Sequence, residues 1–398
     1  MTRYLKFFLC LVATQLPLPV FAQVANLYVE GNNGIYAYDV ASDGKLTLIT
    51  GSPFPGSATS PETLMVVNGK YLYGVSNGTV SNLDPVTTNI DTFSIGANGA
   101  LELLRTTNAA RFDSHDSLRL SSLFLDKTGV TLYAGIDDGY ANPYLSFNIE
   151  EATGELDYAG QVQGNPIAAY PLKLTANNRF AYGGLCDGNG VWRILGYARL
   201  SDGVLVLGKS GKLPEASPGD EFCPLAEVGA ADQTNHVAFA MEPVLDPPVG
   251  NPDGAMQLAT YTADSEGNLT TTSTYKNMPP VAVGWVSNLN MSPSGKVLSV
   301  GGSLGLQLFH FNGAKPITSY TGLIGFGQFD QFRWDNYNHL YAINADTGHL
   351  HIFTVTPTRV SEAPGSPYTI PGGGGYGGAY AFTVQNLPRP TSFSENGK

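Results

Sequence analysis

Short stretches in which aromatic or β-branched residues alternate with other residues recur along the chain at intervals of roughly fifty residues. Alternation with a period of two is typical of a half-buried β-strand. The pattern therefore predicts a series of related strands rather than isolated ones. These stretches are residues 27–29, 71–73, 132–134, 180–182, 237–239, 297–299 and 340–342.

A second alternating stretch follows each of the first ones, and a Gly-x-Leu turn follows the first five of these second stretches. Glycine readily adopts the positive φ that a tight hairpin needs, and the leucine begins a third strand. The sixth copy of the turn is degenerate, with Gly313-Ala314-Lys315, and the seventh is replaced by Thr356-Pro357-Thr358. The second stretches are residues 35–40, 90–95, 145–150, 194–200, 257–263, 306–312 and 350–356.

A further strand ending in a turn precedes several of the first stretches, so each repeat contains four antiparallel strands. We therefore expect an all-β, seven-bladed β-propeller over residues 23–387, followed by a disordered tail at 388–398. The chain opens near Asn26 on the second strand of a blade and ends with an unmatched strand at 378–385. Pairing of that last strand into the N-terminal blade would close the ring and remove exposed strand edges.

Composition supports one repeat domain. Charged residues make up 14% of the 398 residues, hydrophobic residues 42%, and 47 glycines and 26 prolines are spread along the chain. Abundant turn residues combined with enough apolar surface for a core are typical of an all-β protein.

Residues 1–22 resemble a secretory signal peptide, with Arg3 and Lys6 before an apolar run and Val20-Phe21-Ala22 at the end. The apolar run is too short to span a membrane, so we expect a secreted or periplasmic protein without membrane insertion. Removal of this segment leaves two cysteines, Cys186 and Cys223, which could form one disulfide in an oxidising compartment.

The formal net charge is −12. An acidic protein is a poor partner for nucleic acid or for anionic membrane surfaces, and we expect no nucleic-acid partner. A monomer is expected.

Residues 27–54 contain four motifs in succession: Leu-Tyr-Val, Ile-x-x-Tyr-x-Val, Asp-Gly-x-Leu and Gly-Ser-Pro-Phe. This succession resembles the propeller-type lactonase family, which includes 6-phosphogluconolactonase-like and muconate-lactonising-enzyme-like propellers. The resemblance covers nearly the whole chain after residue 22 and implies a seven-bladed propeller with lactonase-like hydrolase activity. The cytoplasmic members carry a Pro-Arg-His segment, where this chain has Cys223-Pro224-Leu225. They also carry an Asn-Glu pair, where this chain has Met241-Glu242, so the resemblance transfers only the glutamate.

Long loops between the first and second strands and between blades should lie on one face of the propeller, and ligand sites are commonly built from such loops. We predict Glu242, His115 and Arg111 as catalytic candidates, because a carboxylate with a histidine and an arginine can support acid–base chemistry. The alternative is that the polar groups of these loops have no function beyond structure, with Asp and Asn capping turns. Predicted substrate-binding candidates from the same loops are Asp113, Asp137, Asp138, Tyr140, Tyr144 and Asp187.

Two functions therefore stay open. The first is hydrolysis of a small lactone by water that a carboxylate activates, and the second is non-catalytic binding of an extracellular protein, peptide or glycan. The acidic loops could also hold a divalent metal, although no recognisable calcium-binding loop is present.

Overall fold

The computed structural model describes residues 21–31, 33–56, 64–77, 88–112, 119–136, 144–164, 172–186, 192–245, 254–371 and 381–388. This part of the chain is all-β, apart from one 3-10 helix, η1 (Ala110–Phe112). The predicted signal peptide and C-terminal tail lie almost entirely outside the described residues. Within those residues, no helix is long and apolar enough to cross a membrane.

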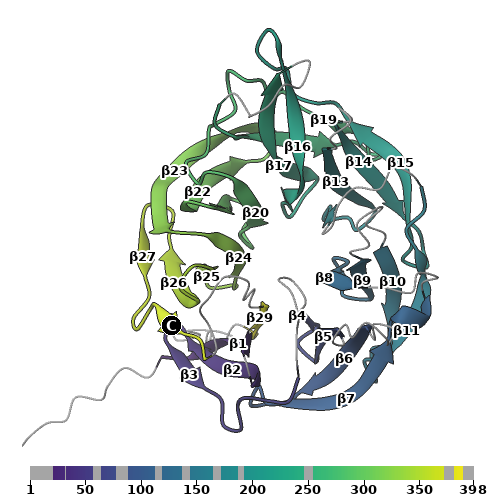
Figure 1. Ribbon diagram of the computed structural model, residues 1–398, viewed down its shortest axis with the longest axis vertical. Helices are drawn as coiled ribbons and strands as arrows, with labels where there is room; N and C mark the ends of the chain where they lie inside the picture. The colour runs from purple at the N-terminus through teal and green to yellow at the C-terminus, as the bar shows by residue number, and fades with distance from the viewer. Residues whose placement is uncertain are drawn as a thin grey trace, which may run out of the picture.

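The strands form antiparallel sheets arranged around a common centre (Figure 1), as expected for a propeller. Four sheets have four strands each. Their strands, from the centre outward, are β29 (Phe382–Asn386), β1 (Gln23–Gly31), β2 (Gly34–Ala41) and β3 (Leu46–Leu48); β4 (Leu64–Val67), β5 (Tyr71–Asn77), β6 (Thr88–Ile95) and β7 (Leu101–Asn108); β8 (Leu120–Leu125), β9 (Thr131–Ile136), β10 (Tyr144–Ile149) and β11 (Leu156–Gln161); and β20 (Val286–Met291), β21 (Val297–Gly302), β22 (Gly305–Asn312) and β23 (Lys315–Phe326).

The two remaining sheets depart from this plan. In one, a parallel bridge between Gly211 of β15 and Leu269 of β19 joins two four-stranded units into eight strands. In the other, a short fifth strand pairs with β26. The eight strands are β12 (Lys173–Leu174), β13 (Phe180–Cys186), β14 (Trp192–Arg199), β15 (Leu205–Gly211), β19 (Leu269–Thr270), β18 (Gln257–Ala263), β17 (His236–Leu245) and β16 (Asp220–Ala231); the five are β24 (Phe329–Trp334), β25 (His339–Asn344), β26 (His349–Val355), β27 (Val360–Glu362) and β28 (Tyr368–Thr369).

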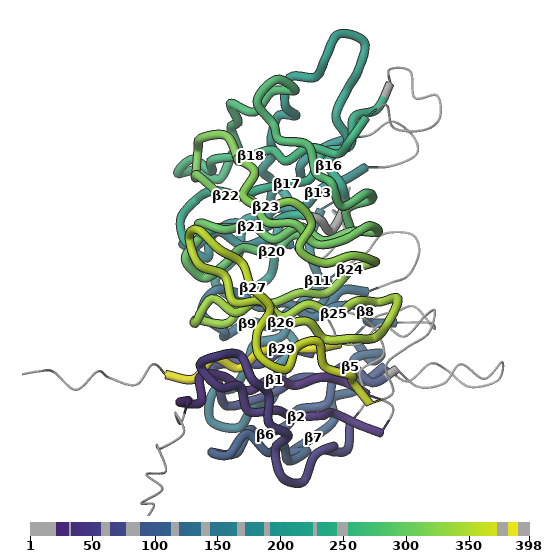
Figure 2. The backbone as a smooth tube through the Cα atoms, turned by 90° about the vertical axis from the view of Figure 1, so that its left-hand side faces the viewer, coloured from purple at the N-terminus to yellow at the C-terminus, as the bar shows by residue number. Residues whose placement is uncertain are grey.

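The C-terminal strand pairs with the N-terminal one, as predicted. β29 runs antiparallel to β1, with Leu27 opposite Val384, and Figure 2 shows this yellow strand beside the purple start of the chain. Gln385 of β29 accepts a hydrogen bond from Asn26 Nδ2 at 2.7 Å and donates one to the carbonyl of Gly69 in the next sheet at 2.7 Å. The described part of the last strand begins at Ala381, because residues 372–380 lie outside the described part.

The core lies between neighbouring sheets. One buried cluster combines Tyr73 and Ile90 of one sheet with Leu132 and Phe147 of the next. Four of the repeated tyrosines also cross the boundary between four-stranded units, because their hydroxyls donate to the glycine carbonyl of the Gly-x-Leu turn in the following unit. These bonds join Tyr28 to Gly99 (3.1 Å), Tyr73 to Gly154 (2.9 Å), Tyr133 to Gly203 (2.7 Å) and Tyr182 to Gly267 (2.8 Å).

Candidate functional site

Glu242 lies on β17, directly opposite Cys223 of the inner strand β16. The two segments that the family resemblance compares, Cys223-Pro224 and Met241-Glu242, are therefore paired in the structure. The Glu242 side chain is 9% exposed, and no described residue donates a hydrogen bond to its carboxylate. Burial raises the pKa of this carboxyl group above its ordinary value, because desolvation disfavours the charged form.

A disulfide joins Cys186 at the end of β13 to Cys223, with the Cα atoms 5.6 Å apart, so the predicted pairing is confirmed. This bond connects the neighbouring four-stranded units of the eight-stranded sheet next to Glu242. The same two strands approach closely at Gly184, where a Cβ atom would collide with the carbonyl oxygens of Pro224 and Leu225. Strand β16 is irregular from Pro224 to Gly229, which interrupts its pairing with β17.

The structure places two other candidates away from Glu242. Arg111 is exposed on η1, and its guanidinium lies 4.5 Å from the centre of the Phe112 ring. Phe112 in turn stacks on Tyr158, with ring centroids 4.4 Å apart. Tyr144 is fully buried and packs edge-on against Phe124 at 5.6 Å, within a core cluster between two sheets. Neither side chain meets Glu242 among the contacts of the described residues.

The remaining loop candidates fall outside the described residues. They are His115, Asp113, Asp137, Asp138, Tyr140 and Asp187.

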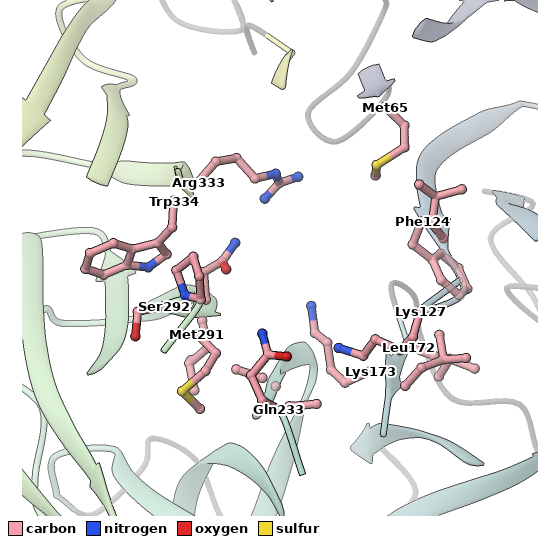
Figure 3. A pocket seen from close by; sticks show the side chains of 18 of the residues that line it. Met65, Phe124, Lys127, Leu172, Lys173, Gln233, Met291, Ser292, Arg333 and Trp334 are labelled. Atoms are coloured by element: carbon pink, nitrogen blue, oxygen red, sulfur yellow. The ribbon is translucent and has the colours of Figure 1, made fainter. Parts of the chain in front are cut away.

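A second feature, which the sequence did not point to, is a cavity of about 440 Å³ at the centre of the molecule. Inner strands of several sheets line it, together with the short turns that connect these strands to the second strands. Lys127 comes from the β8–β9 turn, Gln233 from the β16–β17 turn and Asn336 from the β24–β25 turn. Figure 3 shows the surrounding side chains.

Three of the described side chains that line the cavity carry a positive charge. Lys127, Lys173 of β12 and Arg333 of β24 line it, and none of the described lining side chains is acidic. Part of Lys127 is exposed to solvent, yet desolvation by the surrounding protein lowers the pKa of its ammonium group. The attraction of the Asp232 carboxylate opposes this shift.

No group of three or more His, Cys, Asp or Glu side chains in the described part of the chain is arranged to hold a metal ion. The described residues place a buried carboxylate near a disulfide and, separately, three cationic side chains around a cavity.

No protein-family profile matches the sequence, and no curated protein matches it. Solved structures do match. A candidate 6-phosphogluconolactonase from Bacteroides uniformis superposes with a TM-score of 0.63 at 13% identity, over 91% of this chain and 100% of that chain. A second such protein, from Bacteroides fragilis, gives 0.62 at 14% identity over 92% and 98%. The periplasmic gluconolactonase of Pseudomonas aeruginosa gives 0.61 at 12% identity over 92% and 100%.

The chain has the fold of lactonase-like propellers. The resemblance inferred from the repeat is thus confirmed at the level of the fold. At these identities the likeness concerns the backbone and not the chemistry, because one propeller architecture supports many unrelated activities.

Proposed function

We propose that this protein is an exported, lactonase-like propeller of seven blades that opens a small cyclic ester with water activated by Glu242. The eight-stranded sheet counts as two four-stranded units, which together with the other five sheets makes seven, and the β29–β1 pairing would close the ring. Export is supported by the signal-like residues 1–22 and by the disulfide, a bond typical of oxidising compartments.

The observation that carries the proposal is the environment of Glu242. A buried carboxylate with a raised pKa is a suitable general base, because its pKa lies closer to neutral pH than the pKa of an exposed glutamate. In the proposed reaction Glu242 accepts a proton from water while the water oxygen bonds to the lactone carbonyl carbon. The ring C–O bond then breaks, and the proton passes to the released ring oxygen to give a hydroxy acid.

The test is hydrolysis of a panel of neutral and acidic lactones by the purified protein lacking residues 1–22, with and without divalent metal. We expect Glu242→Gln to lower kcat/KM by about 10²- to 10⁴-fold, the usual contribution of a general base. The matched control is Glu221→Gln, which changes an exposed glutamate on the adjacent strand β16 and should leave turnover unchanged.

The pH profile gives a second readout. Glu242 must be deprotonated to accept a proton. We therefore expect kcat/KM to fall as the pH drops through the pKa of Glu242, which burial raises from its ordinary value. Full activity of Glu242→Gln would remove Glu242 from the mechanism. Hydrolysis no faster than in buffer on every lactone would favour the alternative of a non-catalytic binding propeller.

A further inference from the structure

A groove lies at the outer edge of the eight-stranded sheet, where the outermost strands β15 and β19 of its two four-stranded units meet (Figure 1). The chain that continues from β15 runs parallel to the chain that begins with β19. The two segments pair at two bridges, Gly211 with Leu269 and Glu215 with Thr274. Three residues (212–214) separate the bridges on one segment and four (270–273) on the other, so the segments do not pair regularly between them. We call the space that they enclose, about 560 Å³, the rim groove.

Hydroxyl groups dominate the lining of the rim groove. Thr271 Oγ1 and Ser273 Oγ donate to the carbonyl of Thr260 on the neighbouring strand β18, at 2.6 and 3.4 Å. These bonds hold the segment after β19 against its own sheet, so that one wall of the groove is fixed. Six of the eleven described lining residues carry a hydroxyl: Ser210, Thr270, Thr271, Thr272, Ser273 and Thr274.

Other polar groups of the rim groove have no partner in the part of the chain that the structure describes. The hydroxyls of Ser210, Thr272 and Thr274 make no hydrogen bond to a described residue. Lys212 and Glu215 are exposed, and neither side chain is bonded to or ion-paired with a described residue. An ammonium group only donates hydrogen bonds, a carboxylate only accepts them, and a hydroxyl does both. The groove therefore offers donors and acceptors side by side.

The charges of the rim groove favour a neutral ligand. Lys212 and Glu215 contribute one positive and one negative charge, and the other described lining residues are uncharged. A polyanion would be repelled by Glu215 and a polycation by Lys212. Leu213 and Leu269 add apolar surface beside the polar groups.

We propose that the rim groove binds a saccharide. Each sugar hydroxyl donates and accepts hydrogen bonds, as the lining hydroxyls do, and hydrogen bonds to the Glu215 carboxylate and the Lys212 ammonium are strengthened by their charges. The C–H groups of the sugar ring can pack against the leucines. A volume of about 560 Å³ lies within the usual range of small-molecule sites, roughly 300–1,000 Å³.

The rim groove is separate from the proposed hydrolase site. The groove is built on the outermost strands, whereas Glu242 lies on β17 opposite Cys223 of the inner strand β16. Neither of these two residues lines the groove. Saccharide binding and lactone hydrolysis can therefore be tested independently.

The test is isothermal titration calorimetry of the protein lacking residues 1–22 with maltose and, in a second arm, with N,N′-diacetylchitobiose; the zwitterion glycylglycine is the comparison ligand. We expect at least one disaccharide to bind, with an affinity that salt does not weaken, because the ligand is neutral. Glu215→Ala should weaken binding about tenfold, and Thr272→Val about three- to tenfold, the usual effect of losing a charged or a neutral hydrogen bond.

The matched controls are Glu102→Ala and Thr47→Val, which change exposed residues on the outermost strands β7 and β3 and should leave binding unchanged. Equal weakening by the controls would overturn the proposal, as would failure of both disaccharides to bind at millimolar concentration. Tighter binding of glycylglycine than of either sugar would mean that the groove pairs opposite charges instead. Loss of sugar binding in Glu242→Gln would move the saccharide to the hydrolase site and likewise overturn the assignment. Melting temperatures verify that each variant folds.

Discussion

At the scale of single residues, the repeated tyrosine has a role that its position in the repeat explains. The ring fills the core between two sheets, while the hydroxyl donates to a glycine carbonyl in the next sheet. Without this donor, a buried carbonyl would lose its hydrogen-bond partner, which is costly. Where the repeat has Phe239 in place of tyrosine, the carbonyl of the next turn, Gly313, accepts from Thr260 Oγ1 at 2.7 Å instead.

Tyr133→Phe tests this role. Tyr133 is fully buried and its hydroxyl donates to Gly203 O at 2.7 Å, so the variant keeps the ring but removes the bond. We expect the free energy of unfolding to fall by roughly 1 kcal/mol, measured by urea denaturation. The control is Tyr38→Phe, because the Tyr38 hydroxyl makes no hydrogen bond to any described residue. An equal effect of both variants would contradict the interpretation.

At the scale of elements, the disulfide holds β13 against the irregular inner strand β16. Its two cysteines are 37 residues apart in sequence. A cross-link of this kind stabilises mainly by restricting the unfolded chain, and the effect grows with the length of the closed loop. It also connects the strand opposite Glu242 to the neighbouring unit, so that the bond supports the position of the proposed base.

Replacement of both cysteines, Cys186→Ala with Cys223→Ala, should lower the free energy of unfolding by about 4 kcal/mol in the chain-entropy estimate for a loop of this length. The measurement is urea denaturation with and without a reductant. The reductant should destabilise the wild-type protein and leave the double variant unchanged. Wild-type stability that does not respond to complete reduction would contradict this prediction.

At the scale of the whole molecule, the two ends of the chain form one sheet. Gln385 of β29 is almost completely buried and accepts a hydrogen bond from Asn26 of β1, while it donates to Gly69 after β4. One side chain thus joins the last strand, the first strand and the next sheet. Contacts between residues so distant in sequence close a long loop of chain, and the conformational entropy of that loop opposes their formation.

Gln385→Ala should therefore lower the free energy of unfolding by roughly 2–4 kcal/mol, because it leaves the buried Asn26 amide and the Gly69 carbonyl without these partners. Urea denaturation again provides the measurement. The control, Gln328→Ala, changes an exposed glutamine and should cost less than about 0.5 kcal/mol. A comparable loss in both variants would mean that the Gln385 contacts contribute little.

The sequence by itself determined the strand series and its turns, because alternation with a period of two and glycine at tight turns are local properties of the chain. The first and second stretches that it predicted correspond to strands such as β9 and β10, and the closing strand pairs with β1. The disulfide could also be foreseen, since only two cysteines follow the signal-like segment.

The structure alone revealed the central cavity. Lys127 and Arg333 are roughly 200 residues apart, and neither belongs to a motif or to the long loops in which ligand sites were expected. Their convergence depends on the arrangement of the sheets around a common centre, which brings inner strands and their turns from distant repeats to one cavity. The burial of Glu242 was likewise decided by tertiary packing, because a raised pKa depends on the neighbours that exclude water and not on the residue itself.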